Sequence, residues 1–476
     1  MKCSLVMKAL QRMVSSPNKF IPSISKVVNS APNIRPFNIE ELTFDKYFST
    51  NTLDKFNLNI FMQLLAKYKK PEEVIPTITK MATLNIHPGE DTYSIAISCL
   101  AKGRKLNEVL SIYDKIKDKK EIMTIGIYNG VMLAYVYNYD PYSAEKIFNE
   151  IKTHELIPDT VCYTTLMEGF FRVRNYNKCK EIFYHCRSLK VAEEYMYSII
   201  LKICAITFNT GEAISLFSEL KKQRAIKYCI PYNAYINALC ADSQFCSIAL
   251  EVWEEMKLNM VMPNDFTFQY LLKACSKLGD IDSSLKLLRE MKAYHVSLNS
   301  AMNSHLISTY ANAIFIKKVR NVQQYIDEGW KLFNRMVASN IKISHHTLNA
   351  MIRLLNQGEQ MREVEEKILP LFKLHQLLFT GETYLLLISG YHKQGNLSEV
   401  WKYFMMACEG NINLSNRILS EVLLATIDEE DEDKVNKVLN KCRILEKKIL
   451  RNAIYKASYC KNLTPENRAY VNKYLR

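Results

Sequence analysis

The feature that most constrains the fold of this chain is an aromatic residue that returns at a nearly constant interval. Successive copies are 35, 35, 34, 35 and 36 residues apart: Tyr93, Tyr128, Tyr163, Tyr197, Tyr232 and Phe268. Each is followed directly by a polar residue: Ser94, Asn129, Thr164, Ser198, Asn233 and Gln269. A fixed period of this length is typical of stacked repeats, in which each unit contacts only its neighbours. The period therefore predicts one elongated array across the 476 residues rather than several separate domains.

Each unit of the array is predicted to be a pair of amphipathic helices, named helix A and helix B. In the copy at residues 90–124, apolar residues recur at spacings of three and four on both sides of a turn at residues 102–105. Gly103 in this turn predicts the end of helix A and a free turn after it. Copies in the same frame are predicted to begin at Lys55, Glu90, Ile125, Thr160, Glu194, Cys229, Asp265, Ser300, His345, Gly381 and Asn416.

These features predict an all-α fold class, namely a right-handed α-solenoid of about 10–11 helix-turn-helix repeats with a C-terminal capping helix. The array is expected at residues 55–449, after a linker or N-terminal cap at residues 41–54. The capping helix is expected within residues 450–476, where Thr464 and Pro465 are typical of a helix start. Such a helix would cover the exposed apolar end of the array.

Two irregularities interrupt the spacing. The copy that begins at Ser300 is about nine residues too long, with the excess near residues 316–324. This insertion carries Lys317, Lys318 and Arg320, and it is predicted to be a loop that either touches a phosphate backbone or lies in solvent. The last copy has acidic residues throughout 428–433 in its turn, which predicts a solvated turn or an end to a binding groove.

The charge balance favours a polyanionic partner. The chain has 63 Lys and Arg against 49 Asp and Glu, a formal net charge of +14. Nucleic acid is the first class of partner that this charge favours and an anionic membrane is the second, although helical proteins of organelles can be basic without either. No run of 18 apolar residues occurs, so no transmembrane segment is expected.

The N-terminal residues have the composition of a targeting sequence. Residues 1–39 contain no Asp or Glu but carry several Lys, Arg and Ser, and Met1–Met13 can form a basic amphipathic helix. This pattern is typical of a mitochondrial transit peptide, which is predicted at residues 1–40. A disordered basic arm is the alternative. The predicted localisation is the mitochondrial matrix.

The cysteines and histidines do not indicate a metal site or a disulfide framework. The chain has 13 Cys and no CxxC pair, and the adjacent His345 and His346 are expected at the surface. No catalytic residue, metal ligand or cofactor is predicted. Four cysteines are expected to be buried thiols at a similar place in helix A: Cys99, Cys204, Cys240 and Cys275. This usage is typical of a reducing compartment.

The units resemble the P-type repeats of the pentatricopeptide repeat family. The resemblance rests on phrases at residues 92–97, 127–132 and 162–167, which read TYSIAI, IYNGVM and CYTTLM. It covers residues 55–415 well and 416–449 weakly. The tetratricopeptide repeat has a similar period but an early tryptophan phrase. No copy shows that phrase, because Trp253, Trp330 and Trp401 all fall in predicted B helices.

The resemblance implies that each repeat reads one RNA base with two or three side chains. The reading pair is the fifth residue of a repeat with its last residue. The pairs are Asn59/Gly89, Ser94/Thr124, Asn129/Asp159, Thr164/Glu193, Ser198/Tyr228, Asn233/Asn264, Gln269/Asn299, Ser304/Ser344, Asn349/Thr380 and Leu385/Ser415. By the family's rules Asn129/Asp159 resembles a uridine reader and Asn233/Asn264 a pyrimidine reader. The other pairs depart from the rules, and Leu385 cannot bind a base edge by a hydrogen bond.

The RNA-binding residues predicted from this resemblance are Asn59, Ser94, Thr124, Asn129, Asp159, Thr164, Ser198, Asn233, Asn264, Gln269, Asn299, Ser304 and Asn349. A local bond to the backbone, or a helix cap, is the alternative role for a fifth-position Asn, Ser or Thr.

The function implied is a non-enzymatic mitochondrial protein that binds single-stranded RNA, messenger or ribosomal, in a basic concave groove. It would stabilise a transcript, guide its processing or promote its translation. The alternative is a structural subunit of the mitochondrial ribosome or a related complex, with ribosomal proteins as partners. A fused nuclease is not expected, because few residues follow Ile449 and Glu466 is their only acid. No phosphate-binding loop or hydrolase motif occurs, and no small-molecule substrate is expected.

Overall fold

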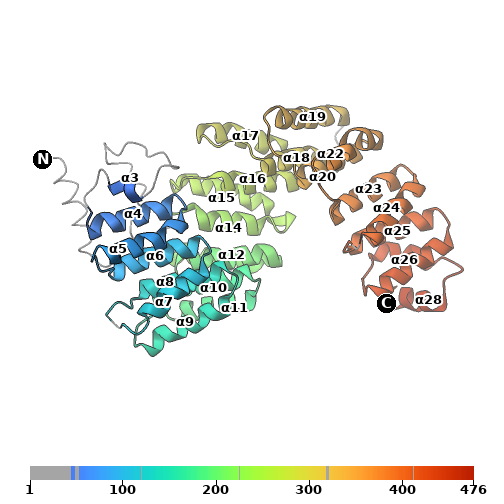
Figure 1. Cartoon of the computed structure of the whole chain (residues 1–476). Helices are drawn as coiled ribbons and strands as arrows, with labels where there is room; N and C mark the ends of the chain where they lie inside the picture. Colours follow the sequence, from blue (N-terminus) through green and yellow to red (C-terminus); the bar gives the residue numbers. More distant parts are fainter. Residues whose placement is uncertain are drawn as a thin grey trace. The chain divides into compact units, whose positions relative to one another are not determined.

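The computed structural model describes residues 44–48, 53–119, 121–223, 226–317, 321–410 and 412–475. These residues form helices and no strand, which confirms the all-α prediction. The predicted transit peptide at residues 1–40 lies outside the described residues. The chain divides into two compact units, residues 1–193 and 194–476, and each consists of successive helix pairs (Figure 1).

Among its described residues, the first unit contains a short helix followed by four helix pairs. Its helices are α3 (Phe44–Phe48), α4 (Lys55–Lys67), η2 (Pro71–Glu73), α5 (Val74–Thr83), α6 (Glu90–Lys102), α7 (Leu106–Ile116), α8 (Ile125–Tyr137), α9 (Pro141–Thr153), α10 (Thr160–Arg172) and α11 (Tyr176–Ser188). The short helix α3 packs its aromatic rings on the first repeat, with the rings of Tyr47 and Phe61 centred 5.1 Å apart. The helix α3 therefore covers one end of this unit.

The second unit continues with further pairs of the same kind. Its helices are α12 (Glu194–Thr207), α13 (Thr210–Gln223), α14 (Cys229–Leu239), η3 (Ser243–Phe245), α15 (Cys246–Leu258), α16 (Asp265–Leu278), α17 (Ile281–Ala293), α18 (Ser300–Lys317), α19 (Val322–Ala338), α20 (His345–Gln357), α21 (Met361–Glu363), η4 (Val364–Ile368), α22 (Leu369–Leu374), α23 (Gly381–Lys393), α24 (Leu397–Glu409), α25 (Asn416–Asp428), α26 (Glu432–Ile444), α27 (Arg451–Ala457) and α28 (Pro465–Leu475). The segment η4 is a π-helical turn directly before Pro370, which has no N–H to continue the ladder.

The A helices begin at the residues where the sequence frame begins its copies, from Lys55 in α4 to Asn416 in α25. Within each unit, every helix A packs on the helix A of the next repeat, as α6 does on α8 and α16 on α18. Most B helices pack on their own helix A and on the next one. Within each unit, the A helices therefore form one layer whose outer face is lined by residues at fixed positions of the repeat.

The periodic aromatic residue makes one of the contacts that join neighbouring repeats. In α10 the ring of Tyr163 lies 5.0 Å from Phe148 of the preceding helix B and 6.1 Å from His185 of its own helix B. In α16, Phe268 lies in the same way between Trp253, at 5.4 Å, and Tyr294, at 5.9 Å. The aromatic residue thus fills the space between two consecutive B helices, where it contributes area burial and ring contacts.

The turn between helix A and helix B has three residues in most repeats, for example residues 138–140 between α8 and α9. The second has a positive φ, as in Arg104 and Tyr139, and the third often caps helix B with an Asp or Asn side chain. For example, Asp140 accepts a hydrogen bond from the Ser143 N–H at 3.0 Å. The cap and the left-handed residue together end one helix and start the next within a very short connection.

Helix A of the copy at residues 90–124 ends where Gly103 predicted, since Gly103 is the C-cap of α6. The φ of Gly103 is −77°, so it is not the left-handed residue, which is Arg104 with φ 59°. A side chain at Gly103 would place its Cβ 2.5 Å from Cγ of Pro71. Glycine is needed at this position because the preceding repeat approaches the backbone closely, and not because the turn requires an unusual φ.

The insertion near residues 316–324 mainly lengthens two helices. The helices α18 and α19 have 18 and 17 residues, whereas most A and B helices have 13. Lys317 belongs to the last turn of α18 and Val322 begins α19, so the predicted long loop is wrong for these parts of the insertion. Lys318 and Arg320 lie outside the described residues.

The C-terminal residues form two helices where one capping helix was predicted. The helix α28 begins at Pro465, and the hydroxyl of Thr464 accepts a hydrogen bond from the Asn467 N–H at 3.3 Å, as expected for a helix cap. The additional helix α27 begins at Arg451, one period after Asn416, and packs on α25. Residues 451–475 are therefore a shortened repeat.

The four predicted core thiols are buried: Cys99, Cys204, Cys240 and Cys275. Burial raises the pKa of the Cys275 thiol to about 12, mainly by desolvation of the thiolate. These cysteines therefore act as small apolar residues between helices.

Glycine substitutions test the turn geometry. Gly279 has φ 62°, and a Cβ there would lie 2.8 Å from the Ala313 backbone N. We expect Gly279→Ala to lower the free energy of unfolding by about 2–3 kcal/mol, because both the φ and the contact become unfavourable. Gly395→Ala should cost about 1 kcal/mol, since its φ is 69° but its surroundings are open. Urea denaturation of the full chain measures both, with Gly211→Ala in α13 as a control that should not destabilise it. Equal losses at Gly279 and Gly395 would contradict the close packing of α16 on α18.

Candidate nucleic-acid interface

The last residue of a repeat is also the N-cap of the next helix A. This holds for Gly89, Thr124, Asp159, Tyr228, Asn264, Ser344, Thr380 and Ser415. Asn299 has the same place, because its Oδ1 accepts a hydrogen bond from the Met302 N–H at 2.9 Å. The predicted reading residues at this position therefore sit at helix N-termini, and several use a side-chain oxygen for the cap.

The two pairs that resemble standard base readers are each joined by a hydrogen bond. Asn129 Nδ2 donates to Asp159 Oδ1 at 3.3 Å, and Asn233 Nδ2 donates to Asn264 Oδ1 at 2.9 Å. The same two acceptor oxygens cap α10 and α16, because they accept from the Cys162 N–H at 2.8 Å and the Thr267 N–H at 3.1 Å. Sequence pattern and structure thus bring these pairs together.

The caps also determine which way the two amides point. An oxygen that accepts from a backbone N–H can only accept from the neighbouring amide, so the Nδ2 of Asn129 and of Asn233 must face it. The Oδ1 atoms of both residues are then buried without a hydrogen-bond partner. A buried acceptor without a donor is uncommon and costs free energy.

Other fifth-position residues bind the threonine at the third position of the next repeat. Asn59 Oδ1 accepts from the Thr92 hydroxyl at 3.0 Å, and Asn349 Oδ1 accepts from the Thr383 hydroxyl at 2.9 Å. The Ser304 hydroxyl lies 3.0 Å from Thr347 Oγ1. Polar contacts between neighbouring A helices therefore use the groups that were predicted to read bases.

Four of the predicted residues are buried. Ser198, Ser304 and Asn349 are 0%, 4% and 3% exposed, and Asn233 is 7% exposed. The Ser198 hydroxyl donates to the Glu194 carbonyl at 2.8 Å, and the Ser304 hydroxyl donates to the Ser300 carbonyl at 2.8 Å. These are the local backbone bonds that were the alternative role for such residues.

The remaining predicted residues are partly exposed. The Thr164 hydroxyl lies 2.9 Å from the carbonyl oxygens of Thr160 and Val161. Ser94, Thr124, Gln269 and Asn299 are of intermediate exposure. Of these, Gln269 lines a cavity on the helix-A face of the second unit.

This cavity is lined by basic residues that were not predicted from the sequence. It has a volume of about 330 Å³ and is formed by α16, α18, α20 and α23. Its lining includes Lys273, Lys277, His305 and Arg353 beside the predicted residues Gln269 and Ser304. Lys273 and Arg353 hold the ninth position of their repeats and Lys277 the thirteenth, so the repeat period itself was the signal that could have found them.

The two lysines of the cavity have no carboxylate partner within 4 Å among the described residues. Lys273 Nζ donates to Asn237 Oδ1 at 2.8 Å, and Lys277 Nζ donates to the Ala241 carbonyl at 3.0 Å. Burial lowers the pKa of Lys273, and the charge of Lys277 lowers it further. Burial also lowers the pKa of His305 to about 4, so this imidazole is neutral near pH 7. The only carboxylate in the lining is that of Glu382, which pairs with Arg353 at 2.6 Å. An anion in the cavity would therefore compensate Lys273 and Lys277.

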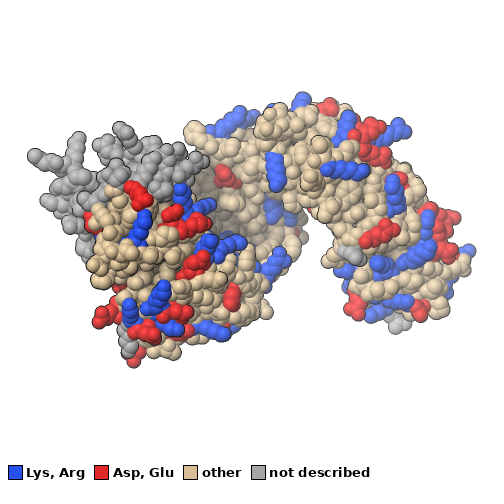
Figure 2. Space-filling model, in the orientation of Figure 1, with Lys and Arg blue, Asp and Glu red and all other residues tan. Residues whose placement is uncertain are grey.

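Charges elsewhere on the molecule are mixed. In the view of Figure 2, Lys and Arg side chains lie in small groups among Asp and Glu, and they do not gather in one large basic patch. The net charge of +14 therefore does not by itself locate an interface. The local pairing of charges on the helix-A face is more informative.

The acidic turn at residues 428–433 is partly compensated by internal contacts. Lys434 Nζ lies 2.7 Å from Glu429 and 3.3 Å from Asp431. Asp428 lies 3.1 Å from both Lys456 and His392. The turn is therefore part of the packing between α23, α25, α26 and α27, and only part of its charge faces solvent.

No group of three His, Cys, Asp or Glu in the described ranges is arranged to hold a metal ion. Within the same ranges, no helix has the length and apolarity needed to cross a membrane.

The contact of His392 with the acidic turn predicts a pH-dependent stability. Hydrogen bonds to Glu421 and Asp428 raise the pKa of His392 above its ordinary value. Its contribution to stability is therefore complete below about pH 6.5 and is lost as the pH rises through the raised folded-state pKa. We expect the melting temperature to fall over this window, and His392→Gln to remove that part of the fall. A variant with the pH profile of the wild type would contradict this assignment.

Sequence comparisons agree with the architecture. A model described as the pentacotripeptide-repeat region of PRORP matches residues 263–454, and three pentatricopeptide repeat models match residues 91–120, 146–204 and 230–277. The fold is thus that of a helical-repeat protein. The chain belongs to the pentatricopeptide repeat family.

Several curated proteins are similar over parts of the chain. A mitochondrial pentatricopeptide repeat-containing protein of Arabidopsis thaliana is 24% identical over 42% of this chain and 25% of its own length. The small ribosomal subunit protein mL103 (rPPR7) of the same organism is 19% identical over 57% of this chain and 64% of its own length. The mitochondrial 15S rRNA processing factor ppr3 of Schizosaccharomyces pombe is 24% identical over 29% of this chain and 21% of its own length. The chain therefore spans less than two thirds of each relative.

A solved structure supports the solenoid fold. The pentatricopeptide repeat protein PPR10 from maize aligns with a TM-score of 0.50 and 15% identity, over 89% of this chain and 65% of that protein. At this identity the likeness concerns the fold alone. It confirms that the predicted α-solenoid is the fold class of the chain.

Proposed function

We propose that this chain binds single-stranded RNA on the face formed by its A helices. The observation that carries the proposal is the cavity of α16, α18 and α20, where Lys273 and Lys277 are partly buried without a carboxylate partner. A phosphate group of RNA supplies the missing negative charge. Phosphate contacts of this kind position a strand and do not read its sequence.

Base recognition is assigned to the two joined pairs. The Oδ1 atoms of Asn129 and Asn233 lack a donor in the free protein. Uridine offers its ring N–H as a donor, and its entry beside Asp159 or Asn264 pairs the orphaned oxygen after a small side-chain movement. The closed residues Ser198, Ser304 and Asn349 hold neighbouring A helices together in this proposal and do not contact bases.

We place the protein in mitochondria, in the matrix. The acid-free composition of residues 1–39 supports this location, as do the mitochondrial names of relatives from Arabidopsis thaliana and Schizosaccharomyces pombe. In this role the protein holds a transcript and thereby protects it, guides its processing or promotes its translation. Binding alone accounts for the role, without catalysis by the repeats.

A structural role in the mitochondrial ribosome is the second candidate. The burial of three fifth-position residues favours this role. The side chains of Ser198, Ser304 and Asn349 are not accessible to an RNA base. The similarity to a ribosomal subunit protein of Arabidopsis thaliana supports the same role. Sedimentation of mitochondrial extracts in high salt distinguishes the two roles, since a ribosomal subunit stays with its particle.

The lysines of the cavity provide the first test. We expect Lys273→Gln with Lys277→Gln to weaken binding of all single-stranded RNA sequences alike and to lower the slope of log affinity against log salt by about 1.4. Filter binding of the full chain at several salt concentrations measures this slope. Lys222→Gln with Lys292→Gln removes the same charge from the B helices α13 and α17 and should leave the slope nearly unchanged. Equal effects of the two double variants would contradict a site in the cavity.

The joined asparagines provide the second test. We expect Asn129→Ala with Asn233→Ala to reduce the preference for pyrimidines at two positions of the bound RNA, by about 1–3 kcal/mol at each. Selection of bound sequences from a random RNA pool measures the preference. Ser198→Ala is the control, because this closed fifth residue should not affect base choice. An unchanged preference in the double variant would show that these pairs serve only as helix caps.

A further inference from the structure

The shortened repeat at the C-terminal end carries a feature that no other repeat has. The fifth and ninth residues of this repeat are Tyr455, in α27, and Tyr459, in the turn after it, whereas the other repeats have no aromatic residue at either position. In α16 and α18 the same two positions line the cavity of the second unit, as Gln269 and Ser308 do. At the positions where most other repeats have hydrogen-bonding side chains, the shortened repeat thus has two aromatic rings.

Both rings are largely open to solvent. Tyr455 is 56% exposed and Tyr459 is 67% exposed, so neither contributes a full side chain to the core. The ring centroids are 5.2 Å apart with an angle of 83° between the planes, and the two hydroxyl oxygens are 2.6 Å apart. In this edge-to-face arrangement each ring holds the other in place while much of its surface remains free.

The surroundings of the two rings are compatible with a polyanion. Lys456, which lies between them, neutralises Asp428 at 3.1 Å, and Lys434 neutralises Glu429. Lys461 and Arg451 are exposed nearby in the chain, and neither side chain forms an ion pair among the described residues, although the Lys461 N–H donates to Glu432 Oε1 at 3.0 Å. Lys456 and Lys434 compensate two of the six carboxylates of the acidic turn.

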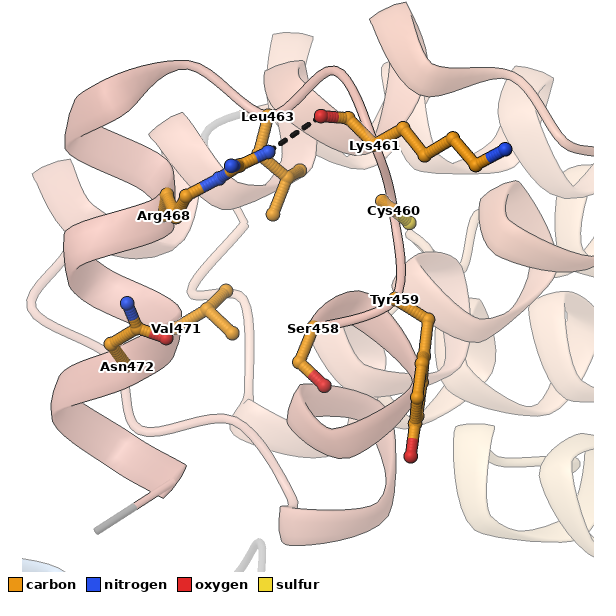
Figure 3. Close-up of a pocket in the computed structure, with 8 residues that line it drawn as sticks. All are labelled: Ser458, Tyr459, Cys460, Lys461, Leu463, Arg468, Val471 and Asn472. Atoms are coloured by element: carbon orange, nitrogen blue, oxygen red, sulfur yellow. Dashed lines mark hydrogen bonds between the residues drawn. The ribbon is translucent and has the colours of Figure 1, made fainter.

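The shortness of α27 leaves a hollow beside the ring of Tyr459. The helix α27 has 7 residues where most A helices have 13, and a cavity of about 380 Å³ lies between its end and α28. Figure 3 shows Tyr459 and Lys461 on the connection that borders the hollow, and Val471 and Arg468 on α28 across from it. The Arg468 guanidinium donates to the Lys461 carbonyl and holds this connection in place. The lining of the hollow is mainly polar, and Leu463 and Val471 are its aliphatic residues.

We propose that the shortened repeat is an end site for RNA, in which one unpaired base stacks on the Tyr455–Tyr459 pair and the adjoining phosphate is neutralised by Lys461. Stacking does not depend on base identity, because every base has a π-face. This site therefore adds affinity and not sequence preference. The inference rests on the proposed RNA-binding function, and it assigns a contact that the fifth-position pairs do not provide.

The test compares two double variants of the full chain. Tyr455→Ala with Tyr459→Ala should weaken binding of single-stranded RNA roughly 5- to 150-fold, as expected for the loss of one stacked base. Tyr455→Phe with Tyr459→Phe keeps both rings and should bind like the wild type. The matched control is Tyr139→Ala with Tyr142→Ala, which removes two other exposed tyrosines at a helix A–helix B turn. Circular dichroism confirms that each variant is folded.

Shortening the RNA locates the contact. In the wild type, removal of the terminal nucleotide at one end should weaken binding by the same factor as the alanine variant does. In the alanine variant, removal of that nucleotide should have no further effect. Losses that simply add, or an alanine variant that binds like the wild type, would overturn the end site while the proposed function stands. A wild type that binds no RNA would overturn both.

Discussion

The structure depends on one repeated contact, the aromatic residue of helix A between two consecutive B helices. The ring centroid of Tyr163 lies 5.0 Å from that of Phe148, and the ring centroid of Phe268 lies 5.4 Å from that of Trp253. The equivalent residues Tyr128, Tyr197 and Tyr232 are almost completely buried. Because the contact joins one repeat to the next, its spacing sets the period of the array. A one-residue change in that spacing would rotate helix A by about 100° and break the contact on one side.

The same contact explains the uneven behaviour of the neighbouring polar residue. The fifth residue follows a buried ring, so its side chain lies at the margin of the packing between A helices. Where those helices pack most closely, as at Ser198 and Ser304, the hydroxyl turns back to its own backbone. At Asn129 and Asn233 the longer amide reaches the cap of the next repeat. Packing therefore decides which members of the polar series remain available to a ligand.

The sequence predicted the start of every complete helix A, because the period and the polar caps both mark it. It did not predict that Gly103 is needed for contact with Pro71, since that contact joins residues of different repeats. It also placed the extra residues near 316–324 in a loop, although helix-forming residues there extend α18 and α19. Lys273 and Lys277 were missed because charge was considered for the whole chain and not position by position in the repeat. The helix α27 was not predicted because it has only seven residues.

The central claim is that the helix-A face is the surface that holds RNA. Photocrosslinking of the purified chain to single-stranded RNA with 4-thiouridine at every uridine, followed by mass spectrometry of the linked peptides, tests it most directly. The account predicts crosslinks in peptides of α8, α14, α16, α18 and α27, and few in the B helices. Crosslinks confined to the B helices, or none with an RNA that binds, would contradict it.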